Sequence, residues 1–259
     1  MEGKFKKAGQ LLRRFGEANE RAKRRASRPK MERTLKSDGS RVFASGCGFY
    51  KLFWVFVLGS FYGDIVETIF VRLNAGEWMS RSSLVIGQFS LVWGIGCFLL
   101  TLLLHRMIGW EDRYIMIAGT VLGGAFEYAC SVFTEKLFGA VFWDYSHMRF
   151  NLNGRINLLY CLFWGIMAVV WLKIIYPWMS EGIEKLPVLF GKILTWALFC
   201  FLLFDITISC AALVRMHQRD LGDLAPKTWA ERYVDRHYTD EWLEERYRNL
   251  KLVPADHSE

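Results

Sequence analysis

Four acidic residues lie inside long apolar runs of this sequence: Asp64, Glu67, Glu127 and Asp205. A charge at the centre of a membrane-spanning helix costs about 2.5–3.5 kcal/mol on insertion scales, so such residues face partners or a water-filled cavity. Asp64 and Glu67 are three residues apart and therefore share one helix face. These carboxylates are the first candidates for chemistry inside a membrane.

Two interpretations of the carboxylates are open. In the first, they line a polar cavity that accommodates a substrate, an ion or a proton. In the second, they pair with arginines and lock the helices together. The candidate partners are Arg81, Arg149 and Arg155.

A polar stretch interrupts the apolar part of the chain. It reads FWDYSHMRFNLNGRINLLYCLFW over residues 142–164. Hydrocarbon cannot solvate its polar side chains, so they must cap helices, pair, or face water at the membrane boundary. Just before it, Glu127, Ser131 and Glu135 follow one another at spacings of four, so all three face one way on a helix. The polar members of the stretch are Asp144, Arg149, Asn151, Asn153, Arg155 and Asn157.

The elements that must position these residues are apolar runs of membrane-spanning length. The chain has 259 residues, of which 53% are apolar and 16% aromatic, and about 20 apolar residues cross a bilayer as a helix. The fold class is therefore all-α: a polytopic transmembrane helix bundle of five spans, or six if the polar stretch also crosses. The five expected spans are Leu52–Val71, Leu84–Leu104, Tyr114–Phe133, Leu158–Trp178 and Ile193–Val214.

Charge divides the chain into three parts. Residues 1–42 form a basic arm, because residues 1–41 hold 14 Lys and Arg against 5 Asp and Glu. Such an excess beside the first span predicts a cytoplasmic N-terminus. The arm is either an amphipathic helix on anionic lipid headgroups or a solvated charge run. Residues 43–214 form the helix bundle, and residues 215–259 a charged, amphipathic tail with a helix start at Thr239.

Other chemistry has no support in the sequence. The Walker A loop and the Rossmann glycine pattern are missing, as are HExxH and the GxSxG elbow. The six cysteines lie mostly in apolar runs and form no CxxC pair, which is typical of small buried side chains. We therefore predict no enzyme activity, cofactor, metal site or nucleic-acid partner.

Several strings in the chain resemble one bacterial family. They are GDIVE in the first span, RSSLVIGQFSLVWGIG before the second, GAFEY in the third, EKLFGAVFWDYSHMRFNLNGRINL, and the late FDITIS. Together they resemble the ABC-transporter permease family called CmpB-like or type IV, over residues 50–215. After Gly87 the family pattern has two prolines that this chain lacks, which weakens the expectation of a kinked or re-entrant entry to the second span.

The resemblance implies a multi-pass protein of the cell membrane that works with a separate nucleotide-binding ATPase subunit. Our first hypothesis is accordingly a permease-like subunit of an ABC-type transporter, of unspecified substrate. A second is a scaffold or regulatory protein of the cell envelope. A third is a lipid-modifying enzyme that uses Asp144 and Glu135 as acid and base. The candidate site, as substrate path or structural polar cluster, comprises Asp64, Glu67, Arg81, Glu127, Glu135, Asp144, Asn151, Arg155 and Asp205.

Overall fold

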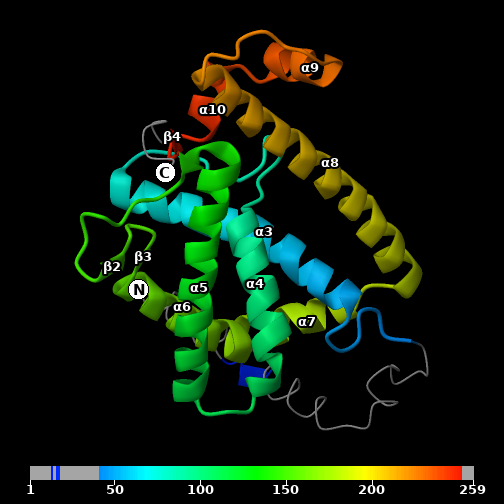
Figure 1. Ribbon diagram of the computed structural model, residues 1–259. Helices are drawn as coiled ribbons and strands as arrows, with labels where there is room; N and C mark the ends of the chain where they lie inside the picture. Colours follow the sequence, from blue (N-terminus) through cyan, green and yellow to red (C-terminus); the bar gives the residue numbers. More distant parts are fainter. Residues whose placement is uncertain (1–12, 14–15, 18–40, 253–259) are drawn as a thin grey trace.

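Helices dominate the computed structural model, which describes residues 13, 16–17 and 41–252 (Figure 1). Most of the predicted basic arm, and the last residues of the tail, lie outside the described residues. Four helical runs are long and apolar enough to cross a membrane. They are α3 (Phe49–Ala75), α5 (Asp112–Phe138), the continuous run of α6 (Leu158–Val170), η2 (Trp171–Ile175) and α7 (Tyr176–Glu184), and α8 (Val188–Asp220).

A fifth apolar helix is shorter than these four. It consists of α4 (Leu91–Leu104) and a terminal turn, η1 (His105–Met107). The sequence predicts this span from Leu84, and that start is wrong. Residues 80–90, here called the entry loop, are not helical.

Side chains replace the missing helical hydrogen bonds of the entry loop. The Ser82 hydroxyl accepts the N–H groups of Leu84 and Phe89, both at 3.2 Å. Gly87 has a φ of 75°, in the left-handed region that favours glycine. The bent entry therefore forms without the two prolines that the family pattern contains.

The successive helices pack as antiparallel pairs. Gly59 of α3 lies against Cys97 of α4, and Gly63, one turn further along α3, lies against Trp93. The later glycine of α3 thus meets the earlier residue of α4, so the two helices run in opposite directions. Gly59 and Gly63 form a GxxxG pair, and without side chains at these two positions α3 and α4 approach closely.

The polar stretch folds outside the helices up to Asn157, and its last residues begin α6. Strands β2 (Asn151–Leu152) and β3 (Ile156–Asn157) form a small antiparallel hairpin, in which Asn151 pairs with Asn157. Strand β1 (Ala140–Val141) directly follows α5 and pairs with β4 (Lys251–Leu252) near the end of the tail. The tail therefore returns to the C-terminal end of α5.

The tail contains two short helices, α9 (Trp229–His237) and α10 (Asp240–Arg246), which lie across the end of α8 (Figure 1). Thr239 caps α10 as the sequence predicts, because its side chain accepts the Trp242 N–H. The complete capping box lies one helix earlier, between Thr228 and Glu231. Helix α8 itself continues past the predicted boundary at Val214 to Asp220.

An ion-pair network holds the tail on α8. Arg215 is 2% exposed, and its Nε donates to Asp235 Oδ1 at 2.9 Å. Arg219 donates to Asp235 at 2.5 Å and also contacts Asp240. Burial raises the pKa of Asp235, but the hydrogen bonds from both arginines outweigh burial and hold that pKa below its ordinary value.

We expect Asp235→Asn to loosen the tail at neutral pH, raising hydrogen exchange of residues 229–237 roughly tenfold. The pKa of Asp235 is lower in the folded than in the unfolded protein. The stabilisation that ionised Asp235 gives the tail is therefore complete above its unfolded pKa of about 3.9, and it is lost as the pH falls through its folded pKa. In the wild type, the hydrogen-exchange protection of residues 229–237, corrected for intrinsic exchange rates, should therefore stay constant down to about pH 5 and weaken toward pH 3. The matched control is Asp220→Asn, at an exposed position; equal exchange in both variants would contradict the prediction.

The bundle has two distinct ends. The tail, the entry loop and the β2–β3 hairpin lie at one end, here called the tail end (Figure 1). Residues 41–48, the α4–α5 turn and the α7–α8 link lie at the other, here called the N-terminal end. Lys173 of η2 joins the α4–α5 turn there, donating to the Trp110 carbonyl oxygen at 2.6 Å.

Candidate functional site

The nine predicted site residues all lie toward the tail end, where the structure divides them into three groups. Two carboxylates form ion pairs with two arginines, and two other side chains hold the hairpin loop. The last three are buried carboxylates, each with at least one oxygen atom that has no hydrogen-bond partner among the described residues. The sequence could not separate these groups, because the partners come from other helices and from the tail.

The ion-paired group is Glu67 with Arg81 and Glu135 with Arg155. Arg81 Nη2 lies 2.7 Å from Glu67 Oε1, and Trp93 donates to the other Glu67 oxygen at 2.7 Å. These two carboxylates fit the second interpretation, in which arginine pairs lock the helices.

Arg155 also links the predicted face of α5 to the hairpin. It forms an ion pair with Glu135 and donates to Ser131 Oγ at 3.2 Å. Glu135 and Ser131 thus share a partner, as their spacing of four residues predicts. Arg149, the third candidate partner, is exposed.

Asp144 and Asn151 hold the loop that precedes β3. Exposed Asp144 accepts the Ser146 N–H at 2.9 Å, and this hydrogen bond lowers the pKa of Asp144. Asn151 donates to the Met148 carbonyl oxygen at 2.6 Å and accepts the Gly154 N–H at 2.9 Å. A lowered pKa is the opposite of what a general acid needs near neutral pH.

Glu127 is the first of the buried carboxylates with an unpaired oxygen. It is 8% exposed, and its Oε1 accepts the Tyr145 hydroxyl at 2.7 Å. Burial and the nearby Glu127 charge raise the pKa of Tyr145, so the phenol stays protonated and donates. Glu127 Oε2 has no hydrogen-bond partner among the described residues.

Asp205 of α8 binds the entry loop. It is fully buried, and its Oδ1 accepts the Ile86 N–H at 3.1 Å and the Ser209 hydroxyl at 3.3 Å. Ser209 in turn accepts the Val85 N–H at 2.9 Å. Within residues 41–252, Asp205 Oδ2 has no donor.

Asp64 of α3 lies near the same loop and has fewer hydrogen-bond partners than Asp205 among the described residues. It is 1% exposed, and neither carboxylate oxygen has a hydrogen-bond partner in the described part of the chain. Ser60 and Thr68, one turn away on either side, likewise have buried, unpaired hydroxyls there. The three form a polar stripe with spare hydrogen-bonding capacity, which is rare in protein interiors.

Arg246 of α10 completes this arrangement from the tail. It donates to the Leu84 carbonyl oxygen at 2.7 Å and to the Gly87 carbonyl oxygen at 2.5 Å. Its charge also acts on both Asp64 and Asp205. No sequence signal could have identified Arg246, which lies 162 residues from its partner Leu84.

We call Ser60, Asp64, Asp205, Ser209 and Arg246 the entry-loop site. Its spare carboxylate oxygens are acceptors, so their natural complement is a cationic or hydrogen-donating group, or a proton. In the described ranges, no group of three His, Cys, Asp or Glu side chains could hold a metal ion. The site can therefore bind or pass donors, and Arg246 supplies a fixed positive charge beside it.

A family model matches residues 54–210, which is more than half of the chain. Its description is "Putative ABC-transporter type IV". The match spans the helices from α3 to α8 and contains all nine predicted site residues, but neither the arm nor Arg246. Searches of curated proteins and of solved structures each found no match.

Proposed function

The chain belongs to this ABC-transporter family, and on that premise we propose that it is the permease-like membrane subunit of an ABC-type transporter. ATP is hydrolysed by a separate subunit, because the sequence contains no Walker A loop. One observation carries the proposal beyond the family match: three carboxylates on the apolar helices, Asp64, Glu127 and Asp205, keep oxygens without hydrogen-bond partners among residues 41–252.

The unpaired oxygens favour a cargo that donates hydrogen bonds. Burying a polar group without a partner costs about 1–3 kcal/mol, so three such groups weaken the fold unless function requires them. The paired residues Glu67 and Glu135 show that the same chain can satisfy carboxylates with arginine. We infer that Asp64, Glu127 and Asp205 handle a cation, a donor-bearing solute or a proton.

The N-terminal end is the proposed cytoplasmic face, where an ATPase subunit would dock. The basic arm precedes α3 at this end, and clustered Lys and Arg beside a span stay cytoplasmic. The α4–α5 turn there exposes Arg106, Trp110 and Glu111, a mixed polar and aromatic surface suited to a partner. The tail then lies on the opposite face of the cell membrane.

We expect cysteine labelling to place the two ends on opposite sides. Lys227→Cys in the tail should react with a membrane-impermeant maleimide in intact cells. Arg106→Cys should react only after permeabilisation, because it lies on the cytoplasmic face. Both positions are exposed; labelling of both from the same side would contradict the five alternating helical runs.

The test of the proposed function is purification of the tagged protein from its native membrane in a mild detergent. We expect a stoichiometric partner with a Walker A loop, identified by mass spectrometry, and ATP hydrolysis by the purified complex. Co-purification of envelope proteins alone would overturn the proposal.

The second candidate, an envelope scaffold, rests on the surface of the tail. Leu224 and Trp229 are 70% and 75% exposed, and exposed apolar side chains are frequent at protein interfaces. In that case, deleting residues 225–252 would abolish function, while neutralising Asp64, Glu127 and Asp205 would leave it intact.

A further inference from the structure

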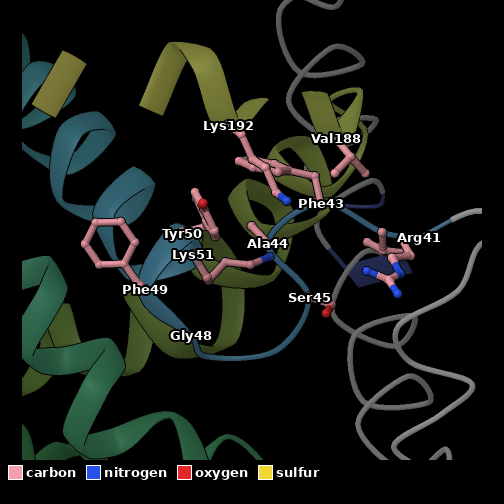
Figure 2. A pocket seen from close by; sticks show the side chains of 11 residues that line it. Arg41, Phe43, Ala44, Ser45, Gly48, Phe49, Tyr50, Lys51, Val188 and Lys192 are labelled. Carbon is pink, nitrogen blue, oxygen red and sulfur yellow. The ribbon is translucent and has the colours of Figure 1, made fainter. Parts of the chain in front are cut away.

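A pocket opens at the N-terminal end, and none of its lining residues belongs to the entry-loop site (Figure 2). It has a volume of about 220 Å³ and lies between residues 41–51 and the start of α8. Its lining includes Arg41, from the segment before α3, and Lys192, from the first turns of α8 (Figure 2). The proposed transport function makes no use of this pocket.

The pocket is electropositive. Exposed Arg41 and Lys192 form no ion pair or side-chain hydrogen bond with any other residue that the structure describes. Lys51 is fully buried and pairs with Glu184 at 2.9 Å. None of the eleven lining residues is acidic. Two positive charges therefore face the pocket without a described partner.

Backbone groups add to this positive character. Helices α3 and α8 both begin at the pocket, and neither Gly48 nor Pro187 caps its helix with a side chain. The first N–H groups of a helix have no intrahelical acceptor and favour anions. Here they supplement the two cations at the pocket wall.

Apart from its cations, the wall of the pocket is largely apolar and adjoins exposed apolar side chains. Phe43 is 2% exposed, and its ring packs over Gly191, where an added Cβ would lie 2.8 Å from ring carbons. Phe49 in the pocket wall and Leu189 next to the lining residue Val188 expose 51% and 73% of their surface, on helices long and apolar enough to cross a membrane. The place thus combines an anion-binding end with an apolar flank.

We propose that this pocket binds the phosphate of an anionic phospholipid headgroup, with Arg41 and Lys192 as the charged ligands. The acyl chains then run along the exposed apolar surface beside Phe49 and Leu189. Basic pockets between membrane helices recognise headgroups in this way. A free phosphate would satisfy the same cations but would not use the apolar flank, so the two sources can be distinguished.

The test uses delipidated full-length protein in neutral detergent, titrated with phosphatidylglycerol, phosphatidylcholine or inorganic phosphate. Native mass spectrometry counts bound lipid, and the thermal midpoint reports stabilisation. We expect phosphatidylglycerol to bind and stabilise the wild type. Arg41→Gln/Lys192→Gln should bind it about 30-fold more weakly, at about 1 kcal/mol for each cation.

The control Arg106→Gln/Lys136→Gln removes the same charge from exposed positions outside the pocket and should bind like the wild type. Because Arg41 and Lys192 are exposed, the pocket variant should unfold at the wild-type temperature without lipid. Equal phosphatidylglycerol affinity in the pocket and control variants would overturn the proposal. If inorganic phosphate stabilised the wild type as much as phosphatidylglycerol does, and the pocket variant lost this stabilisation, the pocket would bind free phosphate and the proposal of a lipid ligand would be overturned.

Discussion

Replacing Arg246 with alanine should lower the thermal midpoint of the detergent-solubilised protein by about 3–12 °C. The side chain donates to the carbonyl oxygens of Leu84 and Gly87 and to Ser80 Oγ. Hydrogen bonds from a charged donor contribute about 1.5–3 kcal/mol, and the Leu84 carbonyl oxygen would lose a donor inside the structure. For a chain of this size, each kcal/mol shifts the midpoint by about 2–4 °C.

The charge and the shape of Arg246 can be tested separately. Arg246→Lys keeps the charge beside Asp64 and Asp205 but cannot bond several carbonyl oxygens in a planar fork, so we expect an intermediate midpoint. Arg248→Ala removes an exposed arginine two residues away and should leave the midpoint unchanged. If Arg248→Ala lowered the thermal midpoint as much as Arg246→Ala, the effect would come from the loss of a positive charge in the tail and not from the hydrogen bonds to the entry loop.

Gly165→Ala should lower the midpoint by about 4–8 °C. An added Cβ would lie 2.3 Å from Thr120 Oγ1 and 2.7 Å from the Met116 backbone oxygen of α5. Because a backbone atom cannot turn aside, α5 and α6 must separate, and overpacking of this kind costs about 1–3 kcal/mol. Differential scanning fluorimetry in detergent measures the shift.

The matched control lies on the same continuous helical run. At Gly182 an added Cβ meets nothing within 4 Å, so Gly182→Ala should raise stability by up to about 1 kcal/mol through helix propensity alone. If both alanine variants shifted the midpoint equally, close packing of α5 on α6 would not be the reason for Gly165.

The apolar runs predicted the helices well, because membrane-spanning length is a local property of sequence. Short spacings were also informative: Glu135 and Ser131 share Arg155, as their separation of four residues implies. The entry loop was missed for a physical reason. Its residues Leu84–Ser90 are apolar enough to continue a helix, and what holds them bent are distant side chains such as Asp205 and Arg246.

The same limit applies within the candidate site. Asp64 and Glu67 share a helix face and looked equivalent in sequence. In the structure, Glu67 binds Arg81 and Trp93, whereas Asp64 has no hydrogen-bond donor among the described residues. The fold of the entry loop therefore determines which of the two carboxylates is ion-paired and which keeps oxygens without described partners. The lock interpretation thus fits Glu67 and Glu135, which pair with arginines, and the cavity interpretation stays a proposal for Asp64, Glu127 and Asp205.

ATP hydrolysis by the protein reconstituted in liposomes with the proposed ATPase subunit tests the central claim most directly. We predict that Asp64→Asn/Glu127→Gln/Asp205→Asn loses most of the wild-type rate in liposomes while its thermal midpoint stays near the wild-type value. Glu67→Gln/Glu135→Gln should do the reverse, with a lower midpoint and a retained rate per folded complex. A wild-type rate in the triple variant would contradict the claim that the unpaired carboxylates serve transport.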